Sequence, residues 1–135
     1  MKIKWLGHSC FLITTNSGVR IVTDPFDETV GYPVPDVETD IVTSSHDHFD
    51  HNYVQSLRGN FQLINSVGSH YVSDVPITGI KTYHDEVMGK KRGENVVYVF
   101  EADGMRLCHL GDLGHLLDDK TVGEIGPVDI LLIPV

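Results

Sequence analysis

Residues 46–51 read His-Asp-His-Phe-Asp-His, so three imidazoles and two carboxylates fall within one short stretch. The apolar run Ile41-Val42-Thr43 comes shortly before it and predicts a short buried strand. Residues 52–57 follow it and predict a short helix that ends at Gly59. We therefore expect the histidine-rich stretch to form a loop at the carboxyl end of a core strand.

The spacing of the histidines in this loop predicts a metal site. Residues two apart in an extended turn face the same side, so His46 and His48 are expected to bind one ion. Asp50 and His51 are expected to face a second ion just beyond. Imidazole nitrogen and carboxylate oxygen together suit zinc, and also manganese or iron. The alternative is a histidine-rich surface loop with adventitious affinity for metals.

A third histidine lies at the end of another predicted strand. Residues 77–83 alternate between apolar and polar side chains, and His84 follows them directly. This position allows His84 to join His46 and His48 as a third ligand of the first ion. The alternative is a solvated loop histidine.

A carboxylate also follows a predicted strand. Asp112 comes just after the strand predicted over residues 105–109, with Gly111 beside it. A carboxylate next to glycine at a strand end can approach closely enough to bridge two cations. The alternative for Asp112 is a cap for a following helix.

The rest of the chain predicts short strands, one further helix and no internal domain boundary. Asp103-Gly104 gives the clearest hairpin, because this dipeptide readily takes the positive φ angles of a tight turn. Residues 118–125 predict a helix with Asp118 or Asp119 as its cap. Further strands are predicted at residues 3–5, 11–13, 19–22, 61–65, 96–102 and 129–135, with a loop over residues 27–39.

The last predicted strand leads to an expectation about the extent of the domain. Its continuous apolar run follows Gly126-Pro127 and predicts a fully buried strand. A chain that stops on a core strand is expected to be part of a larger domain. We expect this strand to pair with a second copy of the chain, in a homo-oligomer, or with a missing C-terminal part.

Composition narrows the classes of partner. Ten Lys and Arg against 19 Asp and Glu give a formal net charge of −9, which argues against nucleic acid as a partner. No apolar run approaches the ~20 residues that span a bilayer, so no membrane is expected. The two cysteines, Cys10 and Cys108, form no disulfide framework and read as small core residues, which favours a cytoplasmic protein.

These motifs together resemble the metallo-β-lactamase superfamily. Its pattern is carried by the His-x-His-x-Asp-His stretch, a lone downstream histidine and a Gly-Asp after a hairpin. Further segments resemble the small metal-dependent hydrolases related to ascorbate-phosphate lactonase, and the likeness covers residues 1–135. These segments are Leu6-Gly7-His8-Ser9-Cys10-Phe11, Asp24-Pro25, Tyr83-His84-Asp85, Arg92-Gly93-Glu94-Asn95 and His109-Leu110-Gly111-Asp112.

The resemblance implies a fold and a set of ligands. The fold is an α/β (α+β) αββα sandwich of two similar halves, of which residues 1–135 form a partial domain that ends before the final metal-binding histidine. The resemblance places His46, His48 and His84 on the first metal. Asp50 and His51 hold the second, and Asp112 bridges both. Two zinc ions are implied for the intact protein, with manganese or iron as alternatives.

The implied reaction is hydrolysis by a metal-activated water. An ester, lactone or phosphate ester is the expected small-molecule substrate, and Asp50 is the expected catalytic residue that accepts or orients the proton of the water. Three alternatives stay open: a non-catalytic metal-binding module, a superfamily nuclease, and a di-iron redox centre. The net charge opposes the nuclease. The lack of an extra Glu in the motif favours hydrolysis over redox chemistry.

Four more residues are candidates for supporting or substrate-facing roles. Asp24 is expected to accept a hydrogen bond from a ligand imidazole, or else to form a turn with Pro25. His8 and His115 flank glycines and are candidates for the mouth of the site. Arg92 belongs to the Lys90-Lys91-Arg92 cluster, which could attract a substrate phosphate or form a solvated hairpin face.

Overall fold

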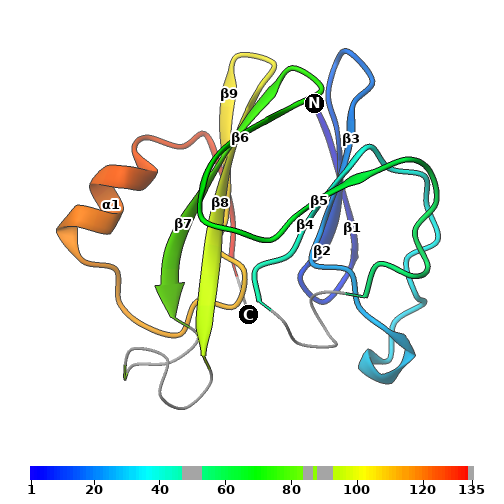
Figure 1. Ribbon diagram of the computed structural model, residues 1–135, viewed down its shortest axis with the longest axis horizontal. Coiled ribbons are helices and arrows are strands. Elements are labelled where there is room, and N and C mark those ends of the chain that lie inside the picture. The colour runs from blue at the N-terminus through cyan, green and yellow to red at the C-terminus, as the bar shows by residue number, and fades with distance from the viewer. Residues whose placement is uncertain (47–52, 84–86, 88–92, 134–135) are drawn as a thin grey trace. The chain divides into compact units, whose positions relative to one another are not determined.

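A computed structural model describes residues 1–46, 53–83, 87 and 93–133 of the chain. The chain divides into two compact units, Met1–Asn65 and Ser66–Val135, each built around its own sheet. Figure 1 shows the strands of both units.

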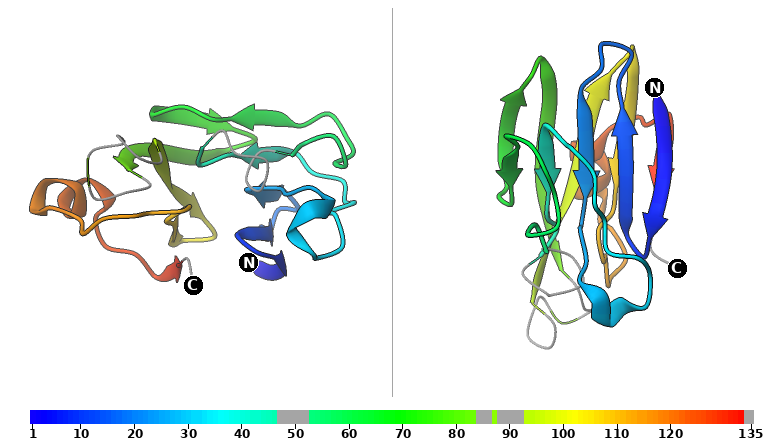
Figure 2. Two further views of the ribbon diagram at one scale, coloured as in Figure 1. Left: turned by 90° about the horizontal axis from the view of Figure 1, so that it is seen from below. Right: turned by 90° about the vertical axis from the view of Figure 1, so that its right-hand side faces the viewer.

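The sheet of the first unit has five strands in sequential order. A hairpin of antiparallel strands comes first, and strands β3, β4 and β5 then run parallel to one another. The right-hand view of Figure 2 shows the antiparallel β1 and β2 in blue. The strands are β1 (Lys2–Gly7), β2 (Cys10–Thr14), β3 (Arg20–Thr23), β4 (Ile41–Thr43) and β5 (Gln62–Ile64).

One face of this sheet packs against the loops that connect its parallel strands. Cys10, Val22 and Val42 come from the sheet, whereas Phe26 and Leu57 come from the connections, and all five side chains are buried together. The single turn of 3-10 helix, η1 (Glu28–Val30), lies in the first connection and is capped by Asp27. The core therefore holds the connections against the sheet and fixes where each strand ends.

The sheet of the second unit also has five strands, in the order β10-β9-β8-β7-β6. Strands β6 to β9 are antiparallel, and β10 lies parallel to β9 at the edge. The strands are β6 (Gly68–Val72), β7 (Val75–Tyr83), β8 (Glu94–Ala102), β9 (Met105–His109) and β10 (Ile130–Leu132).

A short helix, α1 (Asp119–Ile125), packs on one face of this second sheet. Its Ile125 is buried with side chains of β7, β8 and β9, among them Ile80 and Val97. The side chain of Asp118 accepts a hydrogen bond from the backbone N–H of Thr121 at 2.7 Å. The predicted helix and its Asp118 cap are thus confirmed.

Two mixed sheets with few helices confirm the predicted α/β (α+β) class. The Asp103-Gly104 hairpin is also confirmed, because both residues have positive φ angles of 55° and 72° between β8 and β9.

Three details of the predicted elements were wrong. Residues 53–57, the described part of the predicted helix, form a turn and no helix, and the N–H of Leu57 donates to the carbonyl of Val54. Strand β10 is an edge strand and not fully buried, since Leu131 and Ile133 are 50% and 55% exposed. Strand β6 was not predicted at all.

Candidate metal centre

The carboxyl ends of β3 and β4 place two predicted site residues at one edge of the first sheet. These strands are parallel and in register, with Thr23 opposite Thr43. Asp24 therefore leaves the sheet beside Ser44 and Ser45, which lead to His46. The N–H of Asp24 donates to the carbonyl of Thr43 at 2.8 Å, which ties the two strand ends together.

Asp24 is a buried carboxylate in an unusual backbone conformation. It has no exposed surface, and its φ angle of 42° lies in the left-handed region, which Asp tolerates better than most residues. One carboxylate oxygen accepts from the N–H of Ser45 and the other from the hydroxyl of Ser45, both at 2.7 Å. Asp24 therefore accepts two hydrogen bonds from Ser45. Its expected hydrogen bond from a ligand imidazole stays a prediction.

Ser45 connects this carboxylate to His46. The Oγ of Ser45 lies 2.9 Å from Nδ1 of the His46 ring. The hydroxyl of Ser44 donates to the carbonyl of His46 at 3.1 Å, which restrains the backbone at the same residue. Ser44 and Ser45 are both buried, whereas His46 is half-buried. An imidazole whose orientation is set by a buried hydroxyl and carboxylate suits a divalent cation.

The turn between β1 and β2 lies at the same end of this sheet. The hydroxyl of Thr23 donates to the carbonyl of Ser9 at 3.0 Å, so the turn is fastened next to the start of the Asp24 segment. His8 is the exposed residue of this turn and has a φ angle of 52°. Its ring lies edge-on to the ring of Phe26, with 6.5 Å between the ring centroids. Its carbonyl accepts from the indole N–H of Trp5.

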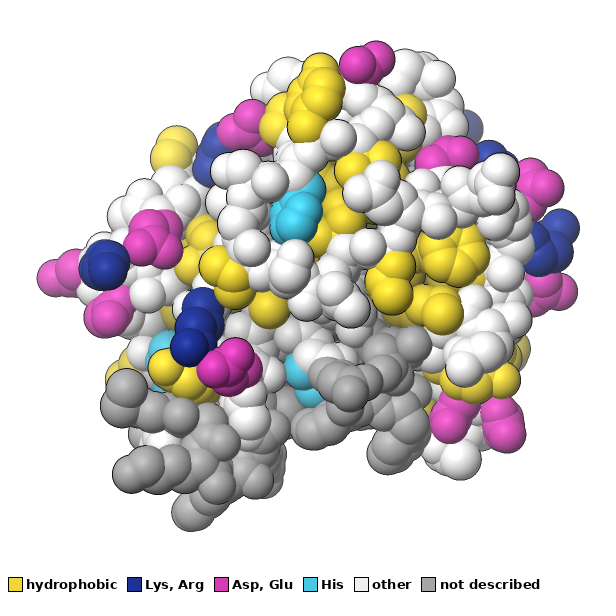
Figure 3. Space-filling model, in the orientation of Figure 1, with side chains coloured by type: hydrophobic (Ala, Val, Ile, Leu, Met, Phe, Trp, Pro, Cys, Tyr) yellow, Lys and Arg dark blue, Asp and Glu magenta, His cyan; other side chains and the backbone are white. Residues whose placement is uncertain are grey.

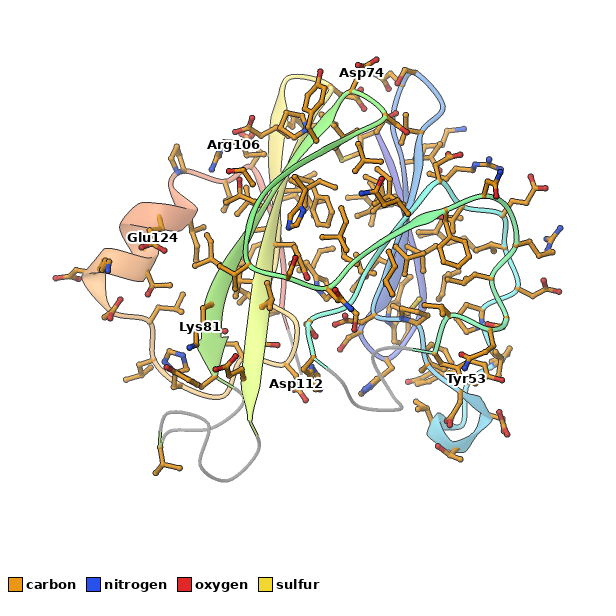
Figure 4. The ribbon with its side chains drawn as sticks, viewed as in Figure 1. Tyr53, Asp74, Lys81, Arg106, Asp112 and Glu124 are labelled. Carbon is orange, nitrogen blue, oxygen red and sulfur yellow. The ribbon has the colours of Figure 1, made fainter. Side chains whose placement is uncertain are left out.

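Asp112 occupies the loop after β9 in the second unit. Figure 4 shows it at the end of the sheet opposite the end that carries Asp74 and Arg106. Gly111 precedes it with a φ angle of 64°, and the N–H of Gly111 donates to Nδ1 of the buried His109 at 3.3 Å. The positive φ angle of Gly111 turns the chain at the end of β9.

Asn95 fixes the backbone of this loop. Its side-chain oxygen accepts from the N–H of Asp112 at 3.0 Å. Its side-chain nitrogen donates to the carbonyl of Leu110 and to the hydroxyl of Thr82, both at 2.9 Å. Asn95 and Thr82 lie opposite each other on β8 and β7 and are buried. The amide oxygen and one amide N–H thus hold the backbone of this loop, and the other N–H ties the amide to Thr82.

His115 lies further along the same loop, against the last residue of β7. The centroid of its ring is 5.8 Å from that of the Tyr83 ring, and the N–H of Gly114 donates to the carbonyl of Tyr83. Because a carbonyl only accepts, the 2.7 Å contact between Nδ1 and the carbonyl of Leu116 places the ring proton on Nδ1. Nε2 of His115 is buried and makes no hydrogen bond with the part of the chain that the structure describes.

Most of the predicted ligands fall outside the described residues. Within the described ranges, no three His, Cys, Asp or Glu side chains come together as a metal site. The described part contains His46 in the first unit and Asp112 in the second. The predicted residues outside it are His48, Asp50, His51, His84 and Arg92.

Sequence reasoning assigned no role to two residues that the structure brings to these loops, Ser45 and Asn95. Ser45 carries no recognisable motif, and only its place directly before His46 could have singled it out. Asn95 stands at the start of an apolar strand, where a polar residue that becomes buried needs hydrogen-bond partners. A polar residue at the start of an apolar strand could therefore have singled out Asn95, although not its contacts with residues 110–112.

The two thiols are structural. Burial, followed by the nearby negative charge of Asp24, raises the pKa of the Cys10 thiol well above its usual range. Burial likewise raises the pKa of Cys108 to about 11. Both thiols stay protonated at neutral pH, so neither is an activated nucleophile or a ready metal ligand.

Neither an extended basic patch on the face drawn in Figure 3 nor a long apolar helix is found among the described residues. On the face drawn in Figure 3, the blue basic side chains are scattered and mostly lie beside magenta acidic ones. Among the described residues, each helix is too short and too polar to cross a bilayer.

A family model described as a beta-lactamase superfamily domain matches residues 2–135. The chain belongs to this superfamily. The resemblance to the metallo-β-lactamase superfamily predicted from the sequence is thereby confirmed.

Two curated superfamily relatives carry the name UPF0173 metal-dependent hydrolase. The protein of Methanobrevibacter smithii is 32% identical over 167 residues, which cover 100% of this chain and 70% of the relative. The protein of Carboxydothermus hydrogenoformans is 30% identical over 166 residues, which cover 100% of this chain and 72% of the relative.

Two solved structures share the fold. A metallo-β-lactamase superfamily protein of Thermotoga maritima is 44% identical with a TM-score of 0.79, over 96% of this chain and 58% of that one. The chain therefore spans little more than half the length of this solved neighbour. The di-iron β-hydroxylase CmlA of Streptomyces venezuelae is 14% identical with a TM-score of 0.69, over 96% of this chain and 33% of that one. The CmlA match shows a shared fold alone.

Proposed function

We propose that the protein is a metal-dependent hydrolase that binds two divalent cations, with zinc preferred over manganese and iron. Its proposed substrate is an ester, a lactone or a phosphate ester. The observation that carries the proposal is the arrangement of Asp24, Ser45 and His46 at the end of β4. A buried carboxylate and hydroxyl here orient the first imidazole of the His-x-His-x-Asp-His stretch. The names of the relatives, metal-dependent hydrolases, support the same class of reaction.

The donor set fits a divalent cation of the zinc type. His46 and His48 supply imidazole nitrogen from the first unit, and Asp50 and His51 add a carboxylate and a third ring. His84 and Asp112 remain the ligands that the sequence predicts from the second unit. Manganese or iron would accept the same donors, so the identity of the metal is part of what the experiment must establish.

The residues of the chain have distinct roles in the proposed reaction. Bound divalent cations would supply a water of lowered pKa and polarise an oxygen of the scissile bond. Asp50 accepts the proton of the attacking water at its carboxylate and orients that water. Asp24 and Ser45 hold His46 in place. Arg92, in the basic cluster with Lys90 and Lys91, attracts the anionic part of a phosphorylated substrate.

The edge of the second sheet supports a proposal about the partner of strand β10. Strand β10 bonds to β9 on one side, and its own residue Leu131 is half exposed. An unprotected strand edge pairs readily with another strand. We propose that a further segment of the same protein, or a second copy of the chain, pairs with it.

Metal analysis combined with turnover tests the proposed function. The full-length gene product is purified, its zinc, manganese and iron are measured, and hydrolysis of a phosphodiester, a carboxylic ester and a lactone is followed before and after chelation. We expect bound metal, hydrolysis of at least one substrate, loss of activity on chelation and recovery on adding zinc. Metal binding without turnover of any of the three would contradict the hydrolase and favour the non-catalytic module.

The Asp50→Asn variant sharpens this test. We expect it to lower kcat by about 100- to 10,000-fold, because it removes the proton acceptor while keeping the shape of the side chain. An unchanged kcat would contradict the role of Asp50. The Arg92→Gln variant serves to identify the substrate, since it should raise KM for phosphate esters and leave a neutral lactone unaffected.

A further inference from the structure

Ser45 occupies a position between a carboxylate and an imidazole that constrains where one proton lies. Its side chain is 1% exposed, and the Asp24 carboxylate beneath it has no exposed surface. The hydroxyl oxygen lies 2.7 Å from Oδ2 of Asp24 and 2.9 Å from Nδ1 of His46. Both distances are those of hydrogen bonds, so all three groups must share their protons consistently.

The number of available protons gives one assignment. The Ser45 hydroxyl has one proton, and an ionised carboxylate can only accept. The proton of Ser45 must therefore point to Asp24 for the 2.7 Å contact to be a hydrogen bond. Ser45 then offers a lone pair to His46, so Nδ1 of His46 must donate. In the opposite assignment, two oxygens with lone pairs would face each other at 2.7 Å.

We infer that Ser45 is a positioning residue that keeps the proton of neutral His46 on Nδ1, so that Nε2 carries the lone pair a metal ion needs. The buried carboxylate of Asp24 acts on the imidazole through this hydroxyl. The placement of the proton is a property of the metal-free protein. Its use in binding a cation rests on the proposed function.

The Asp24→Asn variant gives the sharpest test, because it reverses the hydrogen bonds without removing them. The amide oxygen can still accept from the N–H of Ser45, while the amide nitrogen takes the place of Oδ2 and donates to the Ser45 hydroxyl. The Ser45 proton is then available to His46, and Nδ1 becomes an acceptor. The ring proton moves to Nε2, where it blocks metal binding.

The first measurement is the tautomer of His46 in metal-free protein. Imidazole nitrogens are labelled with ¹⁵N, each ring is observed by NMR above pH 8, and His46 is assigned by its absence in His46→Gln. We expect a protonated Nδ1 in the native protein and a protonated Nε2 in Asp24→Asn. A protonated Nε2 in the native protein, or the same tautomer in both proteins, would overturn the inference whether or not the protein is a hydrolase.

The second measurement is zinc affinity, determined by competition with a chelator. We expect Asp24→Asn and Ser45→Ala each to weaken binding by about 10- to 100-fold, as for other residues that orient a metal-binding histidine. Unchanged affinity in both variants, with the native tautomer as inferred, would overturn the positioning role. Failure of the native protein to bind zinc at all would instead count against the proposed function.

A matched control separates positioning from general destabilisation. Thr39 is 1% exposed, and its hydroxyl lies 3.0 Å from the carbonyls of Arg20 and Ile41, the first residues of β3 and β4. These carbonyls lie at the opposite end of the two strands from Ser45. Thr39→Val removes a buried hydroxyl from the same unit, so it should lower stability while leaving the His46 tautomer and zinc affinity unchanged. An equal loss of zinc affinity in Thr39→Val and Ser45→Ala would show that the effect is only structural.

Discussion

The loop after β4 and the loop after β9 solve different problems with the same kinds of polar group. In the first, a buried carboxylate acts through the Ser45 hydroxyl on the side chain of His46. In the second, the buried amide of Asn95 acts on the backbone around Asp112. One network reaches a ring nitrogen, whereas the other holds main-chain groups and leaves the carboxylate itself to other interactions.

The difference follows from the chemistry of the two predicted ligands. A neutral imidazole has two nitrogens, of which only the unprotonated one can bind a metal, so its proton must be placed. A carboxylate has two equivalent oxygens and needs no such assignment, so the position of its backbone matters more. A residue that supports a metal-binding histidine is therefore expected to contact the ring, whereas one that supports a metal-binding carboxylate is expected to contact the backbone.

Among the variants that test this difference, the largest loss of stability is expected at Asn95. Asn95→Ala removes the side-chain hydrogen bonds to the Leu110 carbonyl, the Asp112 N–H and the Thr82 hydroxyl, whereas the Thr82 hydroxyl keeps its bond to the backbone carbonyl of residue 95. We expect the free energy of unfolding to fall by about 3 kcal/mol, because three hydrogen bonds of a buried amide are lost. Urea denaturation measures this loss.

A control for this variant is Asn60→Ala, which shortens an exposed asparagine and should change stability little. A loss in Asn95→Ala no larger than that of the control would mean that the loop after β9 does not depend on the amide.

The Asn95→Asp variant sharpens the comparison through its pH dependence. A protonated Asp at this position can donate to the Leu110 carbonyl, whereas an ionised one faces that oxygen with like charge. Burial therefore raises its folded pKa above the unfolded value of about 3.9. The stability it contributes is present below that pH and is lost as pH rises through the folded pKa. Thermal melts should place this variant closer to the native protein at pH 4.5 than at pH 8.

Ser45→Ala is expected to have a smaller effect on stability and a larger one on metal binding. Removing one buried hydroxyl should lower the free energy of unfolding by about 1–2 kcal/mol. Zinc affinity should fall by about 10- to 100-fold, since the ring proton of His46 is no longer placed. Paired denaturation and chelator competition would contradict the comparison if Ser45→Ala lost stability as Asn95→Ala does while keeping its zinc affinity.

The smallest expected effect lies at the ion pair at the start of β3 and β4. A hydrogen bond from the Arg20 guanidinium lowers the pKa of Asp40. A lowered folded pKa stabilises the protein above the unfolded value of about 3.9, and this contribution is lost as pH falls through the folded pKa. Arg20→Met should therefore lower the melting temperature slightly at pH 7, and the difference should shrink below pH 4. A difference that grows in acid would contradict this assignment.

Local sequence signals predicted the elements that are determined locally. Asp103-Gly104 turns the chain by its own φ preferences, and Asp118 caps α1 within the helix itself. The helix predicted over residues 52–57 was wrong, since residues 53–57 form a turn in which Leu57 bonds to Val54, and the N–H of Tyr53 bonds to the distant Pro25 carbonyl. Strand β6 was missed because Gly68–Val72 shows no clear alternation, and its hairpin turn uses Ser73 and Asp74, both with positive φ angles.

The candidate site divides in the same way. The sequence identified the histidines and carboxylates, since their spacing along the chain is itself the signal. It assigned no role to Ser45 or Asn95, whose partners lie 21 and 17 positions away at Asp24 and Asp112. Such contacts depend on which strand ends meet at one edge of a sheet, which local sequence patterns do not specify.

An anomalous-diffraction map of zinc-loaded crystals of the full-length gene product tests the central claim most directly. The account predicts a zinc peak about 2.0–2.1 Å from Nε2 of His46, while Nδ1 of the same ring keeps its contact with Ser45. A zinc ion on Nδ1 of His46, or no zinc at His46 in crystals that hold zinc elsewhere, would contradict it.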